Sequence, residues 1–343
     1  MRGFDQPDKT PRGSSMEAVA ILRDLLVKAP DHPGVHHYVI HGFEGSTFAR
    51  DAWPSCTRYA ELVTNIPHAL HMPGHIYAQT GRWEDAVNAF AGAAENERGY
   101  MHADRLYGTG HHGHNVHFLA TSYSFQGQYD KAKDAARELL GFKENPREIA
   151  SIDGFYSAYR QGWFAMLRSL VQSESWDEIL DGSTLPVYDK PREQAWRHWA
   201  MALAYLAKND ASMAQTEAKH MDESLSEYKA KVKMPVPEAL EAAREELNGH
   251  LKLAEGKLDA ALKKLEQAAT MERRMIYSEP PYYPRPVLEV IGQVALKNGR
   301  LTEAESAFKR ALEQYPGSFR AQAGLRATMD SREHKSTAAV GEF

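Results

Sequence analysis

The chain has a single cysteine, Cys56, among its 343 residues. One thiol cannot form an intrachain disulfide or an all-thiolate zinc site. No apolar run approaches the roughly 20 residues that a membrane-spanning helix needs. The formal net charge is −5, whereas nucleic-acid-binding domains typically carry an excess of basic residues. The sequence therefore predicts a soluble protein with neither a membrane nor a nucleic acid as its partner.

The familiar signatures of hydrolases and nucleotide-binding enzymes are missing too. The chain has no Gly-x-Ser-x-Gly elbow, no Walker loop and no His-Glu-x-x-His motif. The run from Gly108 to Gly113 matches a dinucleotide-binding pattern in letters, but no predicted strand precedes it. Any chemistry must therefore come from another set of residues.

The two ends of the chain carry little pattern. Residues 1–13 lack the apolar segment of a secretory signal peptide, and we expect a disordered or vector-derived lead there. The helical pattern then begins as the second half of a repeat, which suggests a fragment of a longer, exported protein and leaves the compartment unknown. From 331 to 343 we expect a flexible tail.

A short motif, Gly-x-(aromatic or Leu)-x-x-Ala, recurs between helical stretches. The copies are Gly81-Arg-Trp-Glu-Asp-Ala86, Gly127-Gln-Tyr-Asp-Lys-Ala132, Gly256-Lys-Leu-Asp-Ala-Ala261, Gly299-Arg-Leu-Thr-Glu-Ala304 and a weaker one that starts at Asn209. Glycine suits the tight turn between two helices, and alanine allows the helices to approach closely. The motif predicts a series of helical hairpins.

This pattern resembles the tetratricopeptide repeat, a helix–turn–helix unit with small and aromatic residues at these offsets. The resemblance covers residues 14–330 and implies an all-α fold, a right-handed α-solenoid of antiparallel helix pairs forming a single array. The spacing between copies is longer than the roughly 34 residues that are usual for this repeat.

Histidine is concentrated in one quarter of the chain. Twelve of the sixteen histidines lie between 32 and 117. Most fall three or four residues apart, which places side chains on one face of a helix. First helices of consecutive repeats line one groove of a solenoid, so imidazoles from several hairpins can meet. The predicted metal ligands are His37, His41, Glu44, His71, His75, His114 and His117.

Four short segments of the chain resemble those of a group of bacterial tetratricopeptide-repeat proteins that are rich in histidine. The segments are His32-Pro-Gly-Val-His-His-Tyr-Val-Ile-His41, His71-Met-Pro-Gly-His75, His114-Asn-Val-His117 and Glu279-Pro-Pro-Tyr-Tyr-Pro. The resemblance implies a shared site and names no substrate.

Imidazole and carboxylate ligands without thiolates favour a divalent ion, above all zinc as one or two ions, with Mn, Fe or Cu left open. We expect a metal-dependent hydrolase of ester-type bonds (phosphoester, phosphotriester or carboxyl ester), because a bound ion makes water a nucleophile near neutral pH. Glu44 is the candidate base or bridging ligand. The candidate substrate contacts are Tyr107, His111, His112, Asp153, Tyr282 and Tyr283.

Two other functions fit the same residues. Tetratricopeptide repeats typically bind peptides, so the histidines could line a non-catalytic scaffold groove that recognises a protein partner. The same ligands could also hold copper or iron in a redox enzyme. The metal content of the protein separates these alternatives from the hydrolase.

Overall fold

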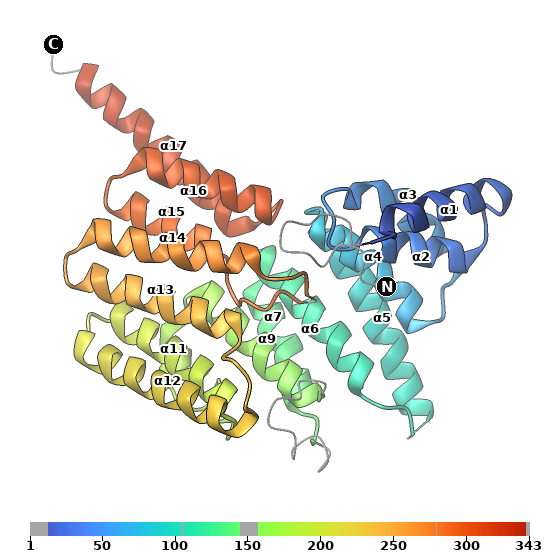
Figure 1. Cartoon of the computed structure of the whole chain (residues 1–343), viewed down its shortest axis with the longest axis horizontal. Coiled ribbons are helices and arrows are strands. Elements are labelled where there is room, and N and C mark those ends of the chain that lie inside the picture. The colour runs from blue at the N-terminus through green and yellow to red at the C-terminus, as the bar shows by residue number, and fades with distance from the viewer. Residues whose placement is uncertain (1–12, 105, 145–156, 279, 341–343) are drawn as a thin grey trace. The chain divides into compact units, whose positions relative to one another are not determined.

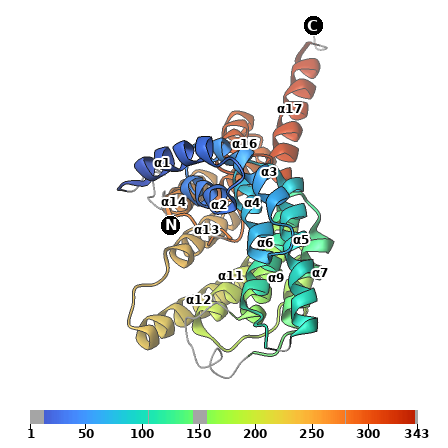
Figure 2. The same cartoon turned by 90° about the vertical axis from the view of Figure 1, so that its right-hand side faces the viewer.

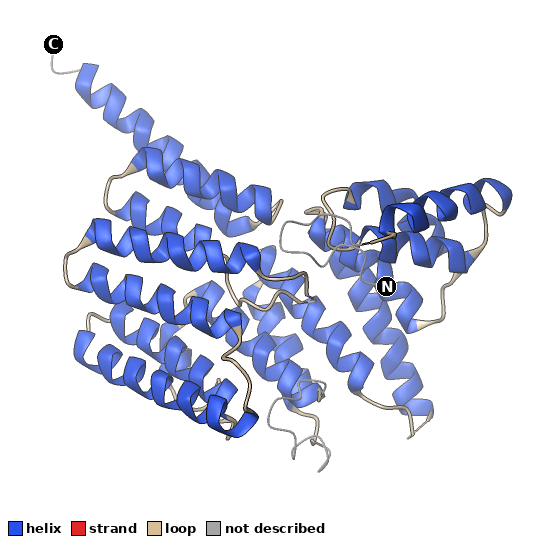
Figure 3. Cartoon of the chain, viewed as in Figure 1, coloured by secondary structure: helices blue, strands red, loops and turns tan. Residues whose placement is uncertain are grey.

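The computed structural model describes residues 13–104, 106–144, 157–278 and 280–340. Helices and loops make up these ranges, which contain no β-strand (Figure 3). The all-α fold predicted from the sequence is therefore confirmed. Residues 1–12 of the predicted lead, and Asp153, lie outside the described residues.

The sequence predicts a single array over 14–330. In the structure the chain divides into two compact units. The first unit comprises 1–169 with 274–282, and the second comprises 170–273 with 283–343. The first unit (Figure 1) holds α1 (Ser15–Lys28), α2 (Pro33–Phe43), η1 (Ala49–Ala52), α3 (Trp53–Leu62), α4 (Pro67–Gln79), α5 (Trp83–Ala103), α6 (Gly110–Phe125), α7 (Tyr129–Leu140) and most of α9 (Ala158–Ser173).

The second unit is built from helical hairpins as well. It holds α10 (Trp176–Leu180), α11 (Pro191–Ala207), α12 (Ala211–Val232), α13 (Glu238–Ala254), α14 (Leu258–Arg274), α15 (Val287–Lys297), α16 (Leu301–Gln314) and α17 (Phe319–Val340). The last helix extends to Val340, so much of the expected tail over 331–343 is helical. Good helix formers (Ala, Arg, Glu and Lys) are common in this stretch, which favours continuation of the helix.

The turns of the predicted motif adopt the backbone conformation that glycine permits. Gly81, Gly127, Gly256 and Gly299 all have φ between 72° and 80°. Asn209, which replaces glycine in the weak fifth copy, has a φ of 61°, as asparagine tolerates this region better than most residues. Each turn joins two helices, and the pairs α4–α5, α11–α12 and α15–α16 pack against one another. The predicted antiparallel helix pairs are confirmed.

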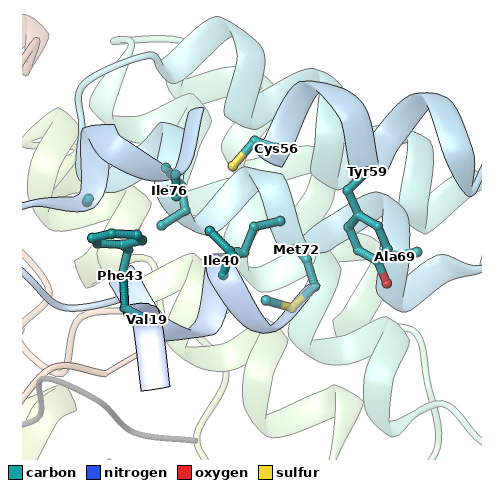
Figure 4. Packing of buried hydrophobic residues seen from close by; sticks show 11 residues of the cluster. Val19, Ile40, Phe43, Cys56, Tyr59, Ala69, Met72 and Ile76 are labelled. Carbon is teal, nitrogen blue, oxygen red and sulfur yellow. The ribbon is translucent and has the colours of Figure 1, made fainter. Parts of the chain in front are cut away.

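Apolar side chains from the first helices form the core that supports the histidine-bearing segments (Figure 4). Ile40 and Phe43 from α2 pack with Met72 and Ile76 from α4, and all four are almost fully buried. Burying one such side chain contributes about 1.5–3 kcal/mol. Cys56 from α3 lies in the same cluster, and burial raises the pKa of its thiol. The core therefore fixes α2 and α4 relative to each other.

Helix α4 begins earlier than the sequence suggests. Pro73 and Gly74 predict a start near Met72, but the helix starts at Pro67 and contains Pro73. Proline suits the first helical position, so Pro67 offers a better start. A Cβ on Gly74 would lie 2.6 Å from Cζ of Phe90 on α5, which shows how closely the two helices pack here. This packing stabilises a helix that contains a proline, and it places His71 inside the helix.

Candidate metal centre

On helix α2 a row of histidines runs beside the row of apolar residues that face the core. The apolar row Val39, Ile40 and Phe43 faces the core, while His41 directly follows Ile40 and His37 lies one helical turn before His41. One residue corresponds to a rotation of about 100° around the helix. The histidines therefore leave the core at its edge, where they are partly buried.

Helix α4 also places its histidines next to the core row, but here each lies one position before a core residue, Ala69, Met72 or Ile76. His71 and His75 are buried, whereas His68 at the N-terminal end is exposed. Helix α2 packs on α4, and the Nε2 atoms of His37 and His68 lie 3.1 Å apart. Two histidine rows thus meet along one seam of the first unit.

Helix α6 supplies the remaining histidines. The sequence predicts a flexible, glycine-rich approach before it, but the helix begins at Gly110, so His111 lies in its first turn. A Cβ on Gly113 would lie 2.9 Å from Cα of Ala158, so this glycine permits close packing against α9. Close packing fixes the helix and brings the His114 ring centroid within 5.1 Å of that of His71.

Seven imidazoles form one continuous group, which we call the seven-histidine cluster. Its members are His37, His41, His68, His71, His75, His111 and His114. Three overlapping triads have donor atoms within 4.8 Å of one another: His37 with His41 and His68, His68 with His71 and His111, and His71 with His75 and His114. We call them the outer, middle and inner triads, respectively.

The separations between ring nitrogens suit a shared ion. The Nε2 atoms of His71 and His75 are 2.9 Å apart, and Nδ1 of His68 is 3.4 Å from Nε2 of His111. Two nitrogens bound to one tetrahedral zinc, each at 2.0–2.1 Å, lie about 3.3 Å apart. Small movements would therefore allow each triad to bind an ion.

The cluster favours neutral imidazoles, the form that binds metals. Burial is the largest influence that lowers the pKa of four rings to about 4: His37, His41, His68 and His114. Burial and repulsion from neighbouring imidazoles hold the pKa of His71 and of His75 well below the usual 6.5. No proton has to be displaced from an imidazolium for these rings to bind an ion near neutral pH.

Two buried carboxyl groups flank the cluster. Glu44 lies 3.0 Å from Nδ1 of His41, and burial raises the pKa of Glu44 to about 8. Glu97 on α5 bonds to Nδ1 of His111 and accepts from Asn115. Carboxylates that bind the outer nitrogen of a histidine commonly orient it as a metal ligand. Glu44 belongs to none of the triads, so its predicted action as a ligand or base stays a prediction.

His117, predicted as a ligand, lies apart from the triads. Its Nδ1 bonds to the side chain of Gln161 on α9. Burial and then the charge of Arg168 lower the pKa of His117 to about 3. The step of three residues from His114 rotates His117 towards α9, which the spacing alone does not reveal. The structure therefore replaces His117 with His68 and His111 in the group of converging imidazoles.

His112, predicted as a substrate contact, is fully buried between two carboxylates. Its Nδ1 lies 3.3 Å from Glu97 and its Nε2 lies 2.9 Å from Glu138. Burial opposes the charged form, but both hydrogen bonds raise the pKa of His112. An imidazole held on both nitrogens links α6 to α5 and α7, and its burial leaves no free face for a substrate.

The predicted tyrosine contacts fall in different places. Tyr107 stacks on Tyr100, with ring centroids 5.5 Å apart. Tyr282 is about half exposed and belongs to the first unit. Tyr283 is buried in the second unit, and its hydroxyl donates to Glu246. Tyr283 therefore serves the second unit's own core, while substrate contact by Tyr107 and Tyr282 stays a prediction.

Two residues of this region are absent from the predicted ligands and contacts: His68, which belongs to two triads, and Glu97, which bonds to His111. The signal that could have placed His68 in this group is its spacing of three residues from His71. Glu97 gave no signal, since one glutamate in the middle of a helix is unremarkable until the fold places it under His111.

A further group of metal-binding residue types occurs in the second unit. It consists of His198, Glu217 and His220. Nδ1 of His198 lies 2.6 Å from Glu217, whereas Nδ1 of His220 lies 4.0 Å from the same oxygen. The short contact fits an ordinary pair between α11 and α12, so this group is a weaker candidate than the seven-histidine cluster.

Comparison with known families supports the repeat type. Residues 247–319 match the tetratricopeptide repeat family. The chain contains tetratricopeptide repeats. The matched segment includes two of the motif turns, at Gly256 and Gly299, and lies outside the seven-histidine cluster. The predicted tetratricopeptide fold is thus confirmed.

The chain also shows distant similarity to solved structures. One is the crystal structure of the APC/C hetero-tetramer Cut9–Hcn1. The match covers 92% of this chain and 52% of the chain in that structure, with 15% identity and a TM-score of 0.37. A second is the structure of Naa15/Naa10 bound to HypK-THB. The match covers 92% of this chain and 37% of the chain in that structure, with 13% identity and a TM-score of 0.28. A third is the P58(IPK) TPR domain. The match covers 94% of this chain and 95% of the chain in that structure, with 13% identity and a TM-score of 0.23. The chain spans about half the length of the first of these.

No curated protein matches the sequence. Among the described helices, none combines the length and apolar composition needed to cross a membrane.

Proposed function

We propose that the seven-histidine cluster binds divalent metal ions and that this tetratricopeptide-repeat protein is a metal-dependent hydrolase of ester-type bonds. The observation that carries the proposal is the convergence of seven imidazoles, from three helices, into triads with ligand spacing. A purely structural site is normally closed by four ligands, whereas three protein ligands leave positions for water and substrate.

The chemistry of the donors fits an ion better than a dry polar cluster. Nδ1 of His71 and Oε1 of Glu44 are buried without a hydrogen-bond partner, and an unpaired buried polar group costs about 1–3 kcal/mol. Folding alone would not select such an arrangement. Imidazole ligands suit zinc, and Mn, Fe or Cu are compatible with the same donors.

The residues around the triads support hydrolysis. A bound divalent ion supplies a water nucleophile near neutral pH and polarises the oxygen of an ester or phosphoester. The exposed ring of His68 leaves the outer triad open to solvent. Glu44 orients His41 through Nδ1, and the elevated pKa of Glu44 keeps a proton available beside the site. A small ester or phosphoester is the substrate class that this arrangement favours.

Metal analysis and turnover test the proposal together. The purified protein should contain zinc and hydrolyse members of a panel of chromogenic carboxyl esters, phosphomonoesters, phosphodiesters and phosphotriesters. A chelator should abolish turnover, and added zinc should restore it. A metal-free protein, or turnover that survives complete metal removal, contradicts the proposal.

The second candidate is a non-catalytic scaffold, which the match to the tetratricopeptide repeat family favours. In that case the histidines would contact a peptide partner by hydrogen bonds, and the purified protein would bind no metal. Copper or iron in place of zinc would instead support a redox enzyme that uses the same ligands.

A further inference from the structure

The ring of His68 has a histidine beside each of its two nitrogens. Its Nε2 lies 3.1 Å from Nε2 of His37, and its Nδ1 lies 3.4 Å from Nε2 of His111. Since the two nitrogens point away from different edges of the ring, the outer and middle triads lie on different sides of His68. Both distances are close to the separation of about 3.3 Å expected for two nitrogens on one zinc.

The number of rings is smaller than the number of ligand positions. Three triads require nine positions, and the seven-histidine cluster supplies seven rings, because His68 and His71 each belong to two triads. Adjacent triads can therefore be filled together only if one imidazole binds two ions. His68 has the geometry for this.

We propose that His68 bridges two metal ions, one in the outer triad through Nε2 and one in the middle triad through Nδ1. The inference rests on the metal binding of the proposed function but not on hydrolysis. A neutral imidazole has one nitrogen lone pair and one N–H. The first ion takes the lone pair, and the second takes the pair left when the N–H proton is released to the buffer.

The residues at either end support this arrangement. His41 in the outer triad has Glu44 on its Nδ1 side, and His111 in the middle triad has Glu97 on its Nδ1 side. A carboxyl group on the Nδ1 side leaves Nε2 of each ring directed at an ion. His68 differs from both, because the imidazole of His111 lies on its Nδ1 side in place of a carboxyl group. Its exposed position also gives ions access from solvent.

The competing explanation is a simple hydrogen bond between His68 and His111, with no ion in the middle triad. Counting bound zinc separates the two. The parent for the experiment carries His198→Ala and His220→Ala, which removes the other group of ligand types in the described residues. Each variant of this full-length parent is loaded with zinc, freed of excess ion and analysed for metal, with circular dichroism to check folding.

The bridge predicts a specific pattern of losses. His37→Ala and His111→Ala should each remove one equivalent of zinc, and His68→Ala should remove two. His102→Ala, an exposed histidine of α5 outside the cluster, should remove none. If His111→Ala keeps every equivalent and His68→Ala loses only one, the bridge is wrong.

A second measurement needs no variant in the cluster. In the copper-loaded parent, bridged ions should couple magnetically, so that the spin count by electron paramagnetic resonance is lower than the copper count. Equal counts overturn the bridge. The ester panel separates this inference from the proposed function: turnover without the pattern of losses refutes the bridge alone, and the pattern without turnover refutes hydrolysis alone.

Discussion

The Nε2 atoms of His71 and His75 face each other at 2.9 Å in the buried part of the seven-histidine cluster. They lie one helical turn apart on α4, a spacing that places side chains side by side. Both rings are almost fully buried. Two imidazoles in this position must either share one proton or bind one ion, and the proposed function takes the ion.

Removing one ring of this pair should abolish metal-dependent turnover. We expect His75→Ala, and His41→Ala in the outer triad, to lower kcat/KM by more than the 10–100-fold typical of losing an outer partner of a metal ligand. The helical circular dichroism signal should remain nearly unchanged, because the apolar core does not include these rings. Unfolding of both variants would instead identify the histidines as structural.

Replacing Glu97 should weaken metal binding without removing a ligand. Burial opposes the charge of Glu97, but hydrogen bonds from His111, His112 and Asn115 lower its pKa to about 2. Glu97→Gln keeps the shape and loses the charge, so zinc affinity should fall about 10–100-fold. Glu95→Gln is the matched control, since Glu95 lies on the same helix and is exposed. Equal zinc affinities for the two variants in competition titrations would refute the role of Glu97.

The packing between α4 and α5 should not tolerate a methyl group at position 74. Gly74→Ala places a Cβ against the ring of Phe90, and such overpacking costs about 1–3 kcal/mol. Gly92→Ala on α5 meets nothing within 4 Å, so it should stabilise the protein by about 0.5–1 kcal/mol, as expected for glycine to alanine in a helix. Urea denaturation should shift in opposite directions for the two variants.

Glu272 should make the stability of the second unit fall as the pH rises. Burial raises the pKa of Glu272 to about 8 from an ordinary value of 4.5, despite hydrogen bonds from Val287 and Tyr315. Between these two values the folded state holds a proton that the unfolded state has lost. The contribution is full below pH 4.5 and is lost as the pH rises to about 8, by at most about 1.4 kcal/mol per pH unit.

Glu272→Gln should remove this slope, because the amide stays neutral at every pH. Glu266→Gln, which changes a half-exposed carboxylate on the same helix, should retain it. Denaturation of each variant at several values between pH 5 and 8 measures the slopes, and parallel curves for the wild type and Glu272→Gln would show that Glu272 does not carry the effect.

The local patterns of the sequence determined the helices and the place of the site. The spacing of apolar residues and the turn glycines depend only on neighbours within a few positions, so the hairpins, and even the left-handed turn at Asn209, could be predicted. The crowding of histidines into 32–117 similarly indicated one metal-binding region.

Only the tertiary structure decided which side chains meet. A spacing of three or four residues places two histidines on one helical face, but it does not say which neighbouring helix that face contacts. His117 bonds to Gln161 and Tyr283 bonds to Glu246, whereas His68 joins two triads and Glu97 bonds to His111. These choices depend on how closely the helices pack, which is set by contacts between residues far apart in the chain, such as Gly74 with Phe90 and Gly113 with Ala158.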